Sequence, residues 1–443
     1  MKITAIFGKN GSGKTLYVER MRRKLASDSV RYIAFRDSYG PSVDHAYYLQ
    51  LRWNQHDIDA ETPNVGQLLE KSFLMTGPDT EQRRQWQAQL YGLLDMKSQL
   101  DKYIITLSSG ELRKFQLAKT LMAQPRILII DNPFIGLDSE TRGLLSQLLK
   151  TLAETQDLEI YLVVSRRSDI PDYVTKIVEC KDDSVELRVE NESRVECKDE
   201  SESSANAQLY TLNSQLDSNS KLSKEVVAFH NVTVSYGNRT ILRDLNWTVC
   251  QGEHWVVDGQ NGSGKSTLLS LVCADNPQGY ACDISLFGHQ RGSGESIWDI
   301  KQRIGYVSPE MHRSYHRDIP ALRIVASGLK DTVGLYVRPT EAEREVCRRW
   351  MRTFGIEHLA DRSFLKMSSG EQRLVLLARA FVKSPELLIL DEPLHGLDDV
   401  NRRMVKHLVD QYCEDPSVTL IYVTHYQEEL PQCIDHSIFL ERH

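Results

Sequence analysis

Two short segments of this 443-residue sequence combine glycine, lysine and a hydroxyl residue in an order that binds phosphate. In the pattern Gly-x-x-x-x-Gly-Lys-Ser/Thr, glycines let successive backbone N–H groups point inward, and the lysine reaches the phosphate oxygens. The first phosphate loop is Gly8, Lys9, Asn10, Gly11, Ser12, Gly13, Lys14 and Thr15, and the second is Gly259, Gln260, Asn261, Gly262, Ser263, Gly264, Lys265 and Ser266, followed by Thr267. The pattern predicts two nucleoside triphosphate sites, with Thr15 and Ser266 as ligands of Mg²⁺.

Two aspartates stand where a metal bound to such a phosphate would need a carboxylate. Asp131 and Asp391 each end a run of four aliphatic residues, 127–130 and 387–390. Such a run is typical of a strand buried on both faces, so its last side chain emerges at the carboxyl edge of a parallel sheet. Although an aspartate at a strand end often only caps a turn, the neighbouring phosphate loops favour Mg²⁺ binding by Asp131 and Asp391.

The chain is a fused duplication. The phosphate loops are 251 residues apart, whereas Ser108-Ser109-Gly110-Glu111 and Ser368-Ser369-Gly370-Glu371 are 260 apart, as are the two aspartates. Buried strands alternate with amphipathic helices that stop at Pro125 and Pro385, which predicts a parallel α/β core in each copy. The first copy begins seven residues before its loop and has lost sequence, so the second is the more complete.

Composition divides the chain into three parts: residues 1–180, an acidic stretch at 181–225, and residues 226–443. The middle part has few large apolar residues and is expected to be a flexible linker. Val185, Leu187 and Val189 alternate within it, however, so they could instead form a short strand that closes the first domain.

The order of these motifs resembles the ATP-binding cassette (ABC) superfamily over nearly the whole chain outside the linker. The resemblance implies two tandem P-loop NTPase domains, each with a mainly parallel core sheet and a helical subdomain; the antiparallel β subdomain is reduced in the first copy. In this family two cassettes bind two ATP molecules head to tail. The signature serine and glycine of one cassette, Ser108 and Gly110 or Ser368 and Gly370, would then contact the ATP held by the other.

The second copy has every catalytic element that the resemblance implies. Glu392 follows Asp391 and matches the family's water-polarising base, and His425 matches the switch histidine that senses the γ-phosphate. Tyr236 resembles the aromatic residue that stacks on adenine. We therefore expect ATP hydrolysis at the site of Lys265, with in-line attack of water on the γ-phosphoryl group.

The first copy departs from this pattern. Asn132 follows Asp131, Ser165-Arg166 occupies the switch position, and the chain starts too late to supply a stacking aromatic upstream. A missing general base costs about 10²–10⁴-fold in rate, so slow or absent turnover is expected there. Arg166 could still contact phosphate, or Asn132 and Arg166 could simply pack in a site without nucleotide.

Within the superfamily, residues 391–398 and Gly334-Leu335-Tyr336 look most like the ModF family of fused cassettes assigned to molybdenum transport or photorepair. This implies an ATP-binding subunit that energises a separate permease for molybdate or another small solute.

The glutamine that couples cassettes to permeases is missing, because Pro309 or Glu310 takes its place; Arg36 and Asp37 are the nearest candidates in the first copy. The alternatives are a soluble tandem ATPase acting on ribosome or nucleic acid, and a nucleotide sensor, which the intact Glu392 and His425 disfavour.

The composition agrees with a protein that has no membrane domain of its own. The net charge is −7, 41% of residues are apolar, and no apolar run reaches the roughly 18 residues needed to span a bilayer. The start of the chain lacks a secretory signal pattern, so we expect a cytoplasmic protein, peripheral to the inner membrane face if a permease holds it.

Partner contacts are expected in the helical segments before each signature, residues 60–105 and 318–362. The eight cysteines show no Cys-x-x-Cys pair, and we expect them to be reduced, mostly structural thiols.

Overall fold

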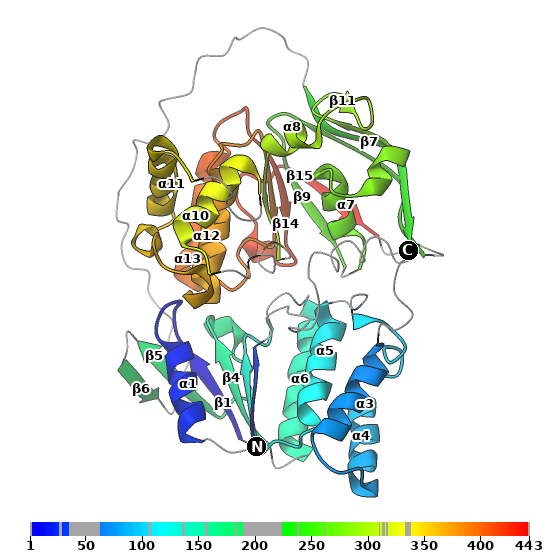
Figure 1. Cartoon of the computed structure of the whole chain (residues 1–443), viewed down its shortest axis with the longest axis vertical. Helices are drawn as coiled ribbons and strands as arrows, with labels where there is room; N and C mark the ends of the chain where they lie inside the picture. Colours follow the sequence, from blue (N-terminus) through cyan, green and yellow to red (C-terminus); the bar gives the residue numbers. More distant parts are fainter. Residues whose placement is uncertain are drawn as a thin grey trace.

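The computed structural model describes two halves of the chain, which Figure 1 shows one above the other. The described residues are 2–25, 29–34, 63–104, 107, 109–134, 137, 139–155, 158–181 and 184–188 in the N-terminal half, and 224–236, 239–260, 262–309, 311, 315, 318–332 and 338–441 in the C-terminal half.

Each half is built on a sheet whose strands follow the same order. The N-terminal sheet runs β2 (Val30–Ala34), β3 (Ile127–Asp131), β4 (Glu159–Val164), β1 (Lys2–Phe7), β5 (Lys176–Lys181) and β6 (Ser184–Arg188). The C-terminal sheet runs β12 (Ile304–Val307), β13 (Leu387–Asp391), β14 (Thr419–Val423), β9 (His254–Gly259) and β15 (His436–Leu440). All neighbouring strands are parallel except β5 and β6. The prediction of a parallel α/β core in each copy is confirmed.

The strand β6 decides between the two possibilities for the start of the linker. It pairs antiparallel with β5 and places Val185 opposite Cys180 and Leu187 opposite Val178. Residues 184–188 therefore extend the N-terminal sheet. Val189 lies outside the described residues.

A second, antiparallel sheet covers part of the C-terminal half. Its order is β11 (His289–Gln290), β10 (Asp283–Leu286), β7 (Glu225–Tyr236) and β8 (Arg239–Cys250). Among the described residues, the N-terminal half has no sheet of this kind. This difference agrees with the expected reduction of the antiparallel subdomain in the first copy.

Helices flank the parallel sheets in both halves (Figure 1). The N-terminal helices are α1 (Lys14–Lys24), α3 (Val65–Met75), α4 (Glu81–Leu93), α5 (Ser109–Leu121) and α6 (Ser139–Thr155). The C-terminal helices are α7 (Lys265–Val272), α8 (Ile297–Gln302), α10 (Ala321–Ser327), α11 (Glu341–Thr353), α12 (Ser369–Phe381) and α13 (Asp399–Tyr412). Because helices cover both faces, the central strands can be apolar along their length: the four aliphatic residues of β13 that precede Asp391 are all buried.

No helix within the described residues is long and apolar enough to cross a membrane. The two halves face each other head to tail in Figure 1. The helix α1, which follows the first phosphate loop, lies on the same side of the molecule as α12 and α13, and α5 and α7 share the other side.

Candidate functional site

Both phosphate loops connect an inner strand of a sheet to a helix. The first joins β1 to α1, and the second joins β9 to α7. Gly13 and Gly264, which immediately precede the two helices, have φ of 82° and 98°. Side chains rarely adopt this left-handed conformation, so the glycines allow the loop to turn its N–H groups inward before the helix begins.

The polar side chains of the two loops are arranged in the same way. Lys14 Nζ donates to the carbonyl oxygens of Gly8 at 2.5 Å and Lys9 at 2.6 Å, and Lys265 Nζ donates to Gly259 and Gln260 at 2.5 and 3.0 Å. Ser12 Oγ and Ser263 Oγ are buried without a hydrogen-bond partner among the described residues. Buried hydroxyls that lack a partner inside a cradle of N–H groups fit an anionic phosphate ligand. Asn261 lies outside the described residues.

Thr15 and Ser266 are exposed in the first turns of α1 and α7, next to the lysines. Asp391 is buried at the end of β13, and Asp131 ends β3 in the N-terminal sheet. Hydroxyl and carboxylate oxygens are the hard ligands that Mg²⁺ prefers. The donor set in each half therefore fits this ion.

Glu392 is held by two histidines. Its Oε1 lies 3.2 Å from His425 Nε2, and its Oε2 lies 3.2 Å from His395 Nδ1. Burial alone would raise the pKa of Glu392, but the nearby His395, His425 and Arg373 outweigh burial and lower this pKa to about 2. The side chain is therefore a carboxylate at neutral pH, with both oxygens fixed in direction.

The corresponding residue of the N-terminal half has the same backbone and a different role. Asn132 and Glu392 have φ of 52° and 48°, and their N–H groups donate to the carbonyls of Val163 and Val423, both at 2.9 Å. The Asn132 side chain donates from Nδ2 to Asp131 Oδ1 at 2.9 Å. The Tyr32 hydroxyl donates to the other oxygen of Asp131 at the same distance. An amide fills the position of the base, so this position has no proton acceptor of carboxylate strength.

Arg166, at the switch position of the N-terminal half, contacts the C-terminal half. Its NH2 lies 3.2 Å from Glu428 Oε1, and Glu429 and Asp399 lie at 3.9 Å from other guanidinium nitrogens. Asp169 of its own half is 3.8 Å away. The side chain is 12% exposed. Of the two possibilities that the sequence left open, these ion pairs favour a packing role for Arg166 over phosphate contact.

The first phosphate loop touches the C-terminal half directly. The N–H of Asn10 donates to Asp398 Oδ2 at 2.8 Å, and Asn10 Nδ2 donates to the carbonyl of Gly396 at 3.2 Å. A Cβ at position 370 would overlap the side-chain amide of Asn10. Gly370 is therefore the residue type that lets the start of α12 approach this loop.

A reciprocal contact comes from the residue after His425. The Tyr426 hydroxyl donates to the carbonyl of Leu137 at 2.7 Å. Leu137 lies between Gly136 and Asp138, which are the counterparts of Gly396 and Asp398. Gly136 and Asp138 themselves lie outside the described residues. Each half therefore contributes this loop to the interface.

The signature residues lie at the starts of helices. This position is expected both for residues that only cap a helix and for residues that also contact a nucleotide. Ser368 caps α12: its Oγ accepts the N–H of Glu371 at 3.3 Å, and Glu371 Oε2 accepts the N–H of Ser368 at 2.7 Å. Ser109, Gly110 and Glu111 form the first turn of α5, whereas Ser108 lies outside the described residues. The cap fixes α12 with Ser369 and Gly370 at its start, facing the first phosphate loop.

Tyr236 ends β7, and its hydroxyl accepts a hydrogen bond from Asn276 Nδ2 at 2.9 Å. The same hairpin reaches the second phosphate loop, because a Cβ at Gly264 would lie 2.9 Å from Ile241 Cγ2 of β8. Pro309 follows β12 and the buried Ser308, while Glu310, Arg36, Asp37 and residues 334–336 lie outside the described residues.

Sequence reasoning missed His395 and Arg373 as parts of this site. Arg373 is buried; its NH2 donates to the carbonyl of Asp391 at 2.9 Å, and its Nε donates to that of Pro393 at 3.2 Å. Arg113 NH1 makes the equivalent bond to the carbonyl of Pro133 at 2.8 Å, at the same offset of 260 residues. The repetition of a buried arginine at this offset was the available signal for Arg373.

Comparison with known proteins gives matches over both halves. The family model described as ABC transporter matches residues 1–135 and 242–395. The ABC transporter ATP-binding protein ModF of Escherichia coli is 35% identical, and the match covers 98% of this chain and 90% of that protein. An uncharacterized ABC transporter ATP-binding protein of Schizosaccharomyces pombe is 28% identical over 97% of this chain and 90% of its own.

A solved structure that covers 99% of this chain is the complex of an archaeal ribosomal stalk protein with an archaeal ribosome recycling factor. It aligns over 83% of that chain with 17% identity and a TM-score of 0.49.

Gly370→Ala should separate the first phosphate loop from α12 without weakening the helix itself, because alanine is the better helix former. We expect faster hydrogen exchange at residues 8–13 than in the wild type. The control is Gly143→Ala in α6, where a Cβ would meet nothing within 4 Å. It should leave exchange in the loop unchanged and stabilise the chain by up to about 1 kcal/mol. Equal exchange in the loop of both variants would contradict the contact.

Nucleotide binding at the first phosphate loop should weaken in mild alkali. Burial lowers the pKa of Lys14 to about 8, although the charges of Asp131 and Asp398 oppose this shift. The lysine therefore carries its charge below about pH 8 and loses it above, while a bound phosphate favours the charged form. Between pH 7 and pH 9 we expect about a tenfold loss of ATP affinity, measured by calorimetry on a Lys265→Ala background that isolates this site.

The matched control is Lys14→Arg on the same background, because arginine stays charged throughout this range. Its affinity for ATP should be independent of pH between 7 and 9. A similar pH dependence in both variants would assign the effect to another group.

Proposed function

The chain belongs to the ABC transporter family and is a tandem ATP-binding cassette ATPase, and from this premise we propose that it hydrolyses ATP at one of two composite sites and drives a separate membrane permease. The cargo would be molybdate or another small solute, as the similarity to ModF suggests.

Each composite site would combine the phosphate loop of one half with the signature helix of the other. The contact of Asn10 with Asp398 and the close approach of Gly370 support this pairing for the first phosphate loop. The competent site would consist of the second phosphate loop with Asp391, Glu392 and His425, closed by Ser108, Ser109 and Gly110 of the N-terminal half. Tyr236 would stack on the adenine of this ATP.

The observation that carries the proposal is the fixed carboxylate of Glu392 between His425 and His395. In this mechanism Glu392 accepts a hydrogen bond, and then the proton, from a water molecule as its oxygen attacks the γ-phosphorus in line with the leaving ADP oxygen. The Nε2 atom of His425 lies 3.2 Å from Oε1 of Glu392, and His425 would also contact the γ-phosphate. Lys265 would stabilise charge on the β- and γ-phosphate oxygens.

Ser266 and Asp391 would hold Mg²⁺ in the competent site, and Thr15 and Asp131 would hold it in the other. When bound, this ion neutralises charge on the β- and γ-phosphates and orients them.

The site of the first phosphate loop would bind ATP and turn it over slowly. Lys14, Thr15 and Asp131 are present, but Asn132 donates to Asp131 where Glu392 would accept a proton. Because Arg166 is paired with acidic residues of the other half, it cannot replace the switch histidine without breaking those pairs. This site would therefore act mainly by holding the two halves together.

Partner contact by the helical segment before the first signature is supported by exposed apolar side chains. Leu74 and Met75 at the end of α3 are 54% and 77% exposed, and Leu93 at the end of α4 is 39% exposed. Leu74 and Met75 are adjacent in the sequence, and exposed apolar side chains that lie together favour burial against another protein. A permease at the inner face of the membrane is the partner that we propose for this surface.

The catalytic assignment predicts that replacing the Glu392 carboxylate by an amide has a large effect on turnover. Glu392→Gln keeps the shape of the side chain but removes the proton acceptor, so we expect kcat to fall by about 10²–10⁴-fold with ATP still bound. The measurement is steady-state phosphate release beside nucleotide retained after rapid desalting.

The matched control is Asn132→Asp at the equivalent position, which should leave kcat within about threefold because the switch position there holds Arg166. Turnover that survives Glu392→Gln would move the catalytic site elsewhere.

The permease proposal is tested with the trapped protein. Tagged Glu392→Gln, purified from detergent-solubilised membranes of its own organism with ATP, should recover a protein with several membrane-spanning segments. Met75→Asp in this background should reduce the recovery at least about fivefold, because it places a charge in an apolar contact. Leu144→Asp, at an exposed position of α6, should not. Recovery of ribosomal subunits in place of a membrane protein would overturn the permease and leave the ATPase assignment intact.

A further inference from the structure

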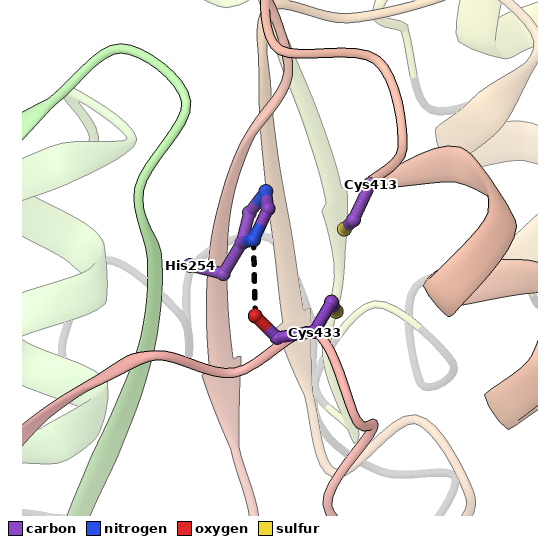
Figure 2. A group of neighbouring side chains, drawn as sticks. All are labelled: His254, Cys413 and Cys433. Atoms are coloured by element: carbon purple, nitrogen blue, oxygen red, sulfur yellow. Dashed lines mark hydrogen bonds between the residues drawn. The ribbon is translucent and has the colours of Figure 1, made fainter.

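Three side chains that the ATPase mechanism does not use gather at the other end of the C-terminal sheet. They are His254 at the start of β9, Cys413 directly after α13, and Cys433 in the turn before β15 (Figure 2). One ligand atom from each lies within 4.8 Å of the other two. The second phosphate loop begins at Gly259, about 17 Å away along β9. The cluster is therefore separate from the nucleotide sites.

The His254 ring is oriented as in a metal ligand. Its Nδ1 lies 3.1 Å from the carbonyl oxygen of Cys433, which Figure 2 marks with a dashed line. Since a carbonyl only accepts, Nδ1 carries the hydrogen, so Nε2 is the nitrogen that can offer a lone pair to a metal. The residue is 8% exposed, and Nε2 is buried with no hydrogen-bond partner among the described residues. A metal-binding histidine characteristically donates its other N–H to a carbonyl or carboxylate.

The two thiols differ from the other buried cysteines in that they meet at a histidine. Cys273 and Cys347 are buried in apolar cores, as expected for cysteines that only pack. Cys413 is also buried, but its sulfur points toward the His254 ring in Figure 2, and Cys433 is half-buried in the neighbouring turn. Asp410 Oδ1 accepts the N–H of Cys433 at 2.9 Å and so fixes the backbone of that turn.

We propose that His254 Nε2, Cys413 Sγ and Cys433 Sγ bind one Zn²⁺ ion as a structural site. Two thiolates and one imidazole suit zinc, and their two negative charges are balanced by the ion inside the protein. Ligand atoms in a tetrahedral zinc site lie about 3.5–4 Å apart, so the present spacing needs only small side-chain movements to close. Cys433, the most exposed of the three, marks the side from which the ion enters.

The ion would join three segments that are far apart in the sequence. The helix α13 begins beside Asp398, which contacts the first phosphate loop, and ends at Cys413. The strand β9 leads from His254 into the second phosphate loop. A zinc ion at this position therefore stabilises the scaffold behind both loops, and its loss lowers the stability of the C-terminal half.

The test is the metal content of the full chain purified without chelator and then dialysed against Zn²⁺. Elemental analysis should give about one zinc per chain, and X-ray absorption should show two sulfur ligands and at least one nitrogen ligand. His254→Gln, Cys413→Ser and Cys433→Ser should each lower the bound zinc at least about tenfold. Cys347→Ser, at a buried cysteine outside the cluster, should keep it.

Thermal unfolding gives a readout that is independent of metal counting. A chelator should lower the Tm of the wild type and of Cys347→Ser, with no effect on a folded cluster variant. If the cluster variants fail to fold, X-ray absorption of the wild-type protein decides whether the zinc has two sulfur ligands and a nitrogen ligand. No zinc bound after dialysis, a disulfide between Cys413 and Cys433 in the purified chain, or zinc retained by all three cluster variants would overturn the site.

Discussion

One carboxylate links a helix of the C-terminal half directly to the first phosphate loop. Asp398 uses Oδ1 to accept the N–H of Asn401 at 2.8 Å and thereby caps α13, and it uses Oδ2 to accept the N–H of Asn10. An N-cap aspartate is rigid because its helix holds it. The same residue thus fixes a helix of the C-terminal half and a phosphate-binding loop of the N-terminal half, and a displacement of either reaches the other through a charge-assisted hydrogen bond.

The paired positions 132 and 392 show which part of the site is set by the fold. Both adopt a left-handed backbone that non-glycine residues rarely occupy, and both donate to the neighbouring central strand. The backbone is therefore the same whether the side chain is an amide or a carboxylate. The chemistry of the two halves can diverge at this position without altering the sheet, because the side chain contributes little to its hydrogen bonding.

The sequence was sufficient to predict what local patterns determine: the two loops, the aspartates at the ends of β3 and β13, and the strand-helix alternation around them. His395 and Arg166 were different. His395 meets Glu392 only because the backbone turns back over three residues, and Arg166 meets Glu428 only after two halves dock across 262 residues. The His395 contact depends on the local turn of the backbone, whereas the contact of Arg166 follows from the tertiary arrangement of two halves, and motif spacing contains neither. For the same reason, the convergence of His254, Cys413 and Cys433 escaped a search for closely spaced ligands.

The N-terminal half has Asn132 and Arg166 where the C-terminal half has Glu392 and His425, and it still contacts the other half through Arg166. Arg166 lies within ion-pair distance of three carboxylates of the C-terminal half, and the Tyr426 hydroxyl donates to the carbonyl of Leu137. Of the three carboxylates only Glu429 is buried, and removal of Arg166 would leave that desolvated charge with one partner fewer. In the proposed mechanism, a half that turns ATP over slowly serves as a platform for its partner. In the proposed mechanism, opening and closing would be concentrated where the second phosphate loop faces the start of α5.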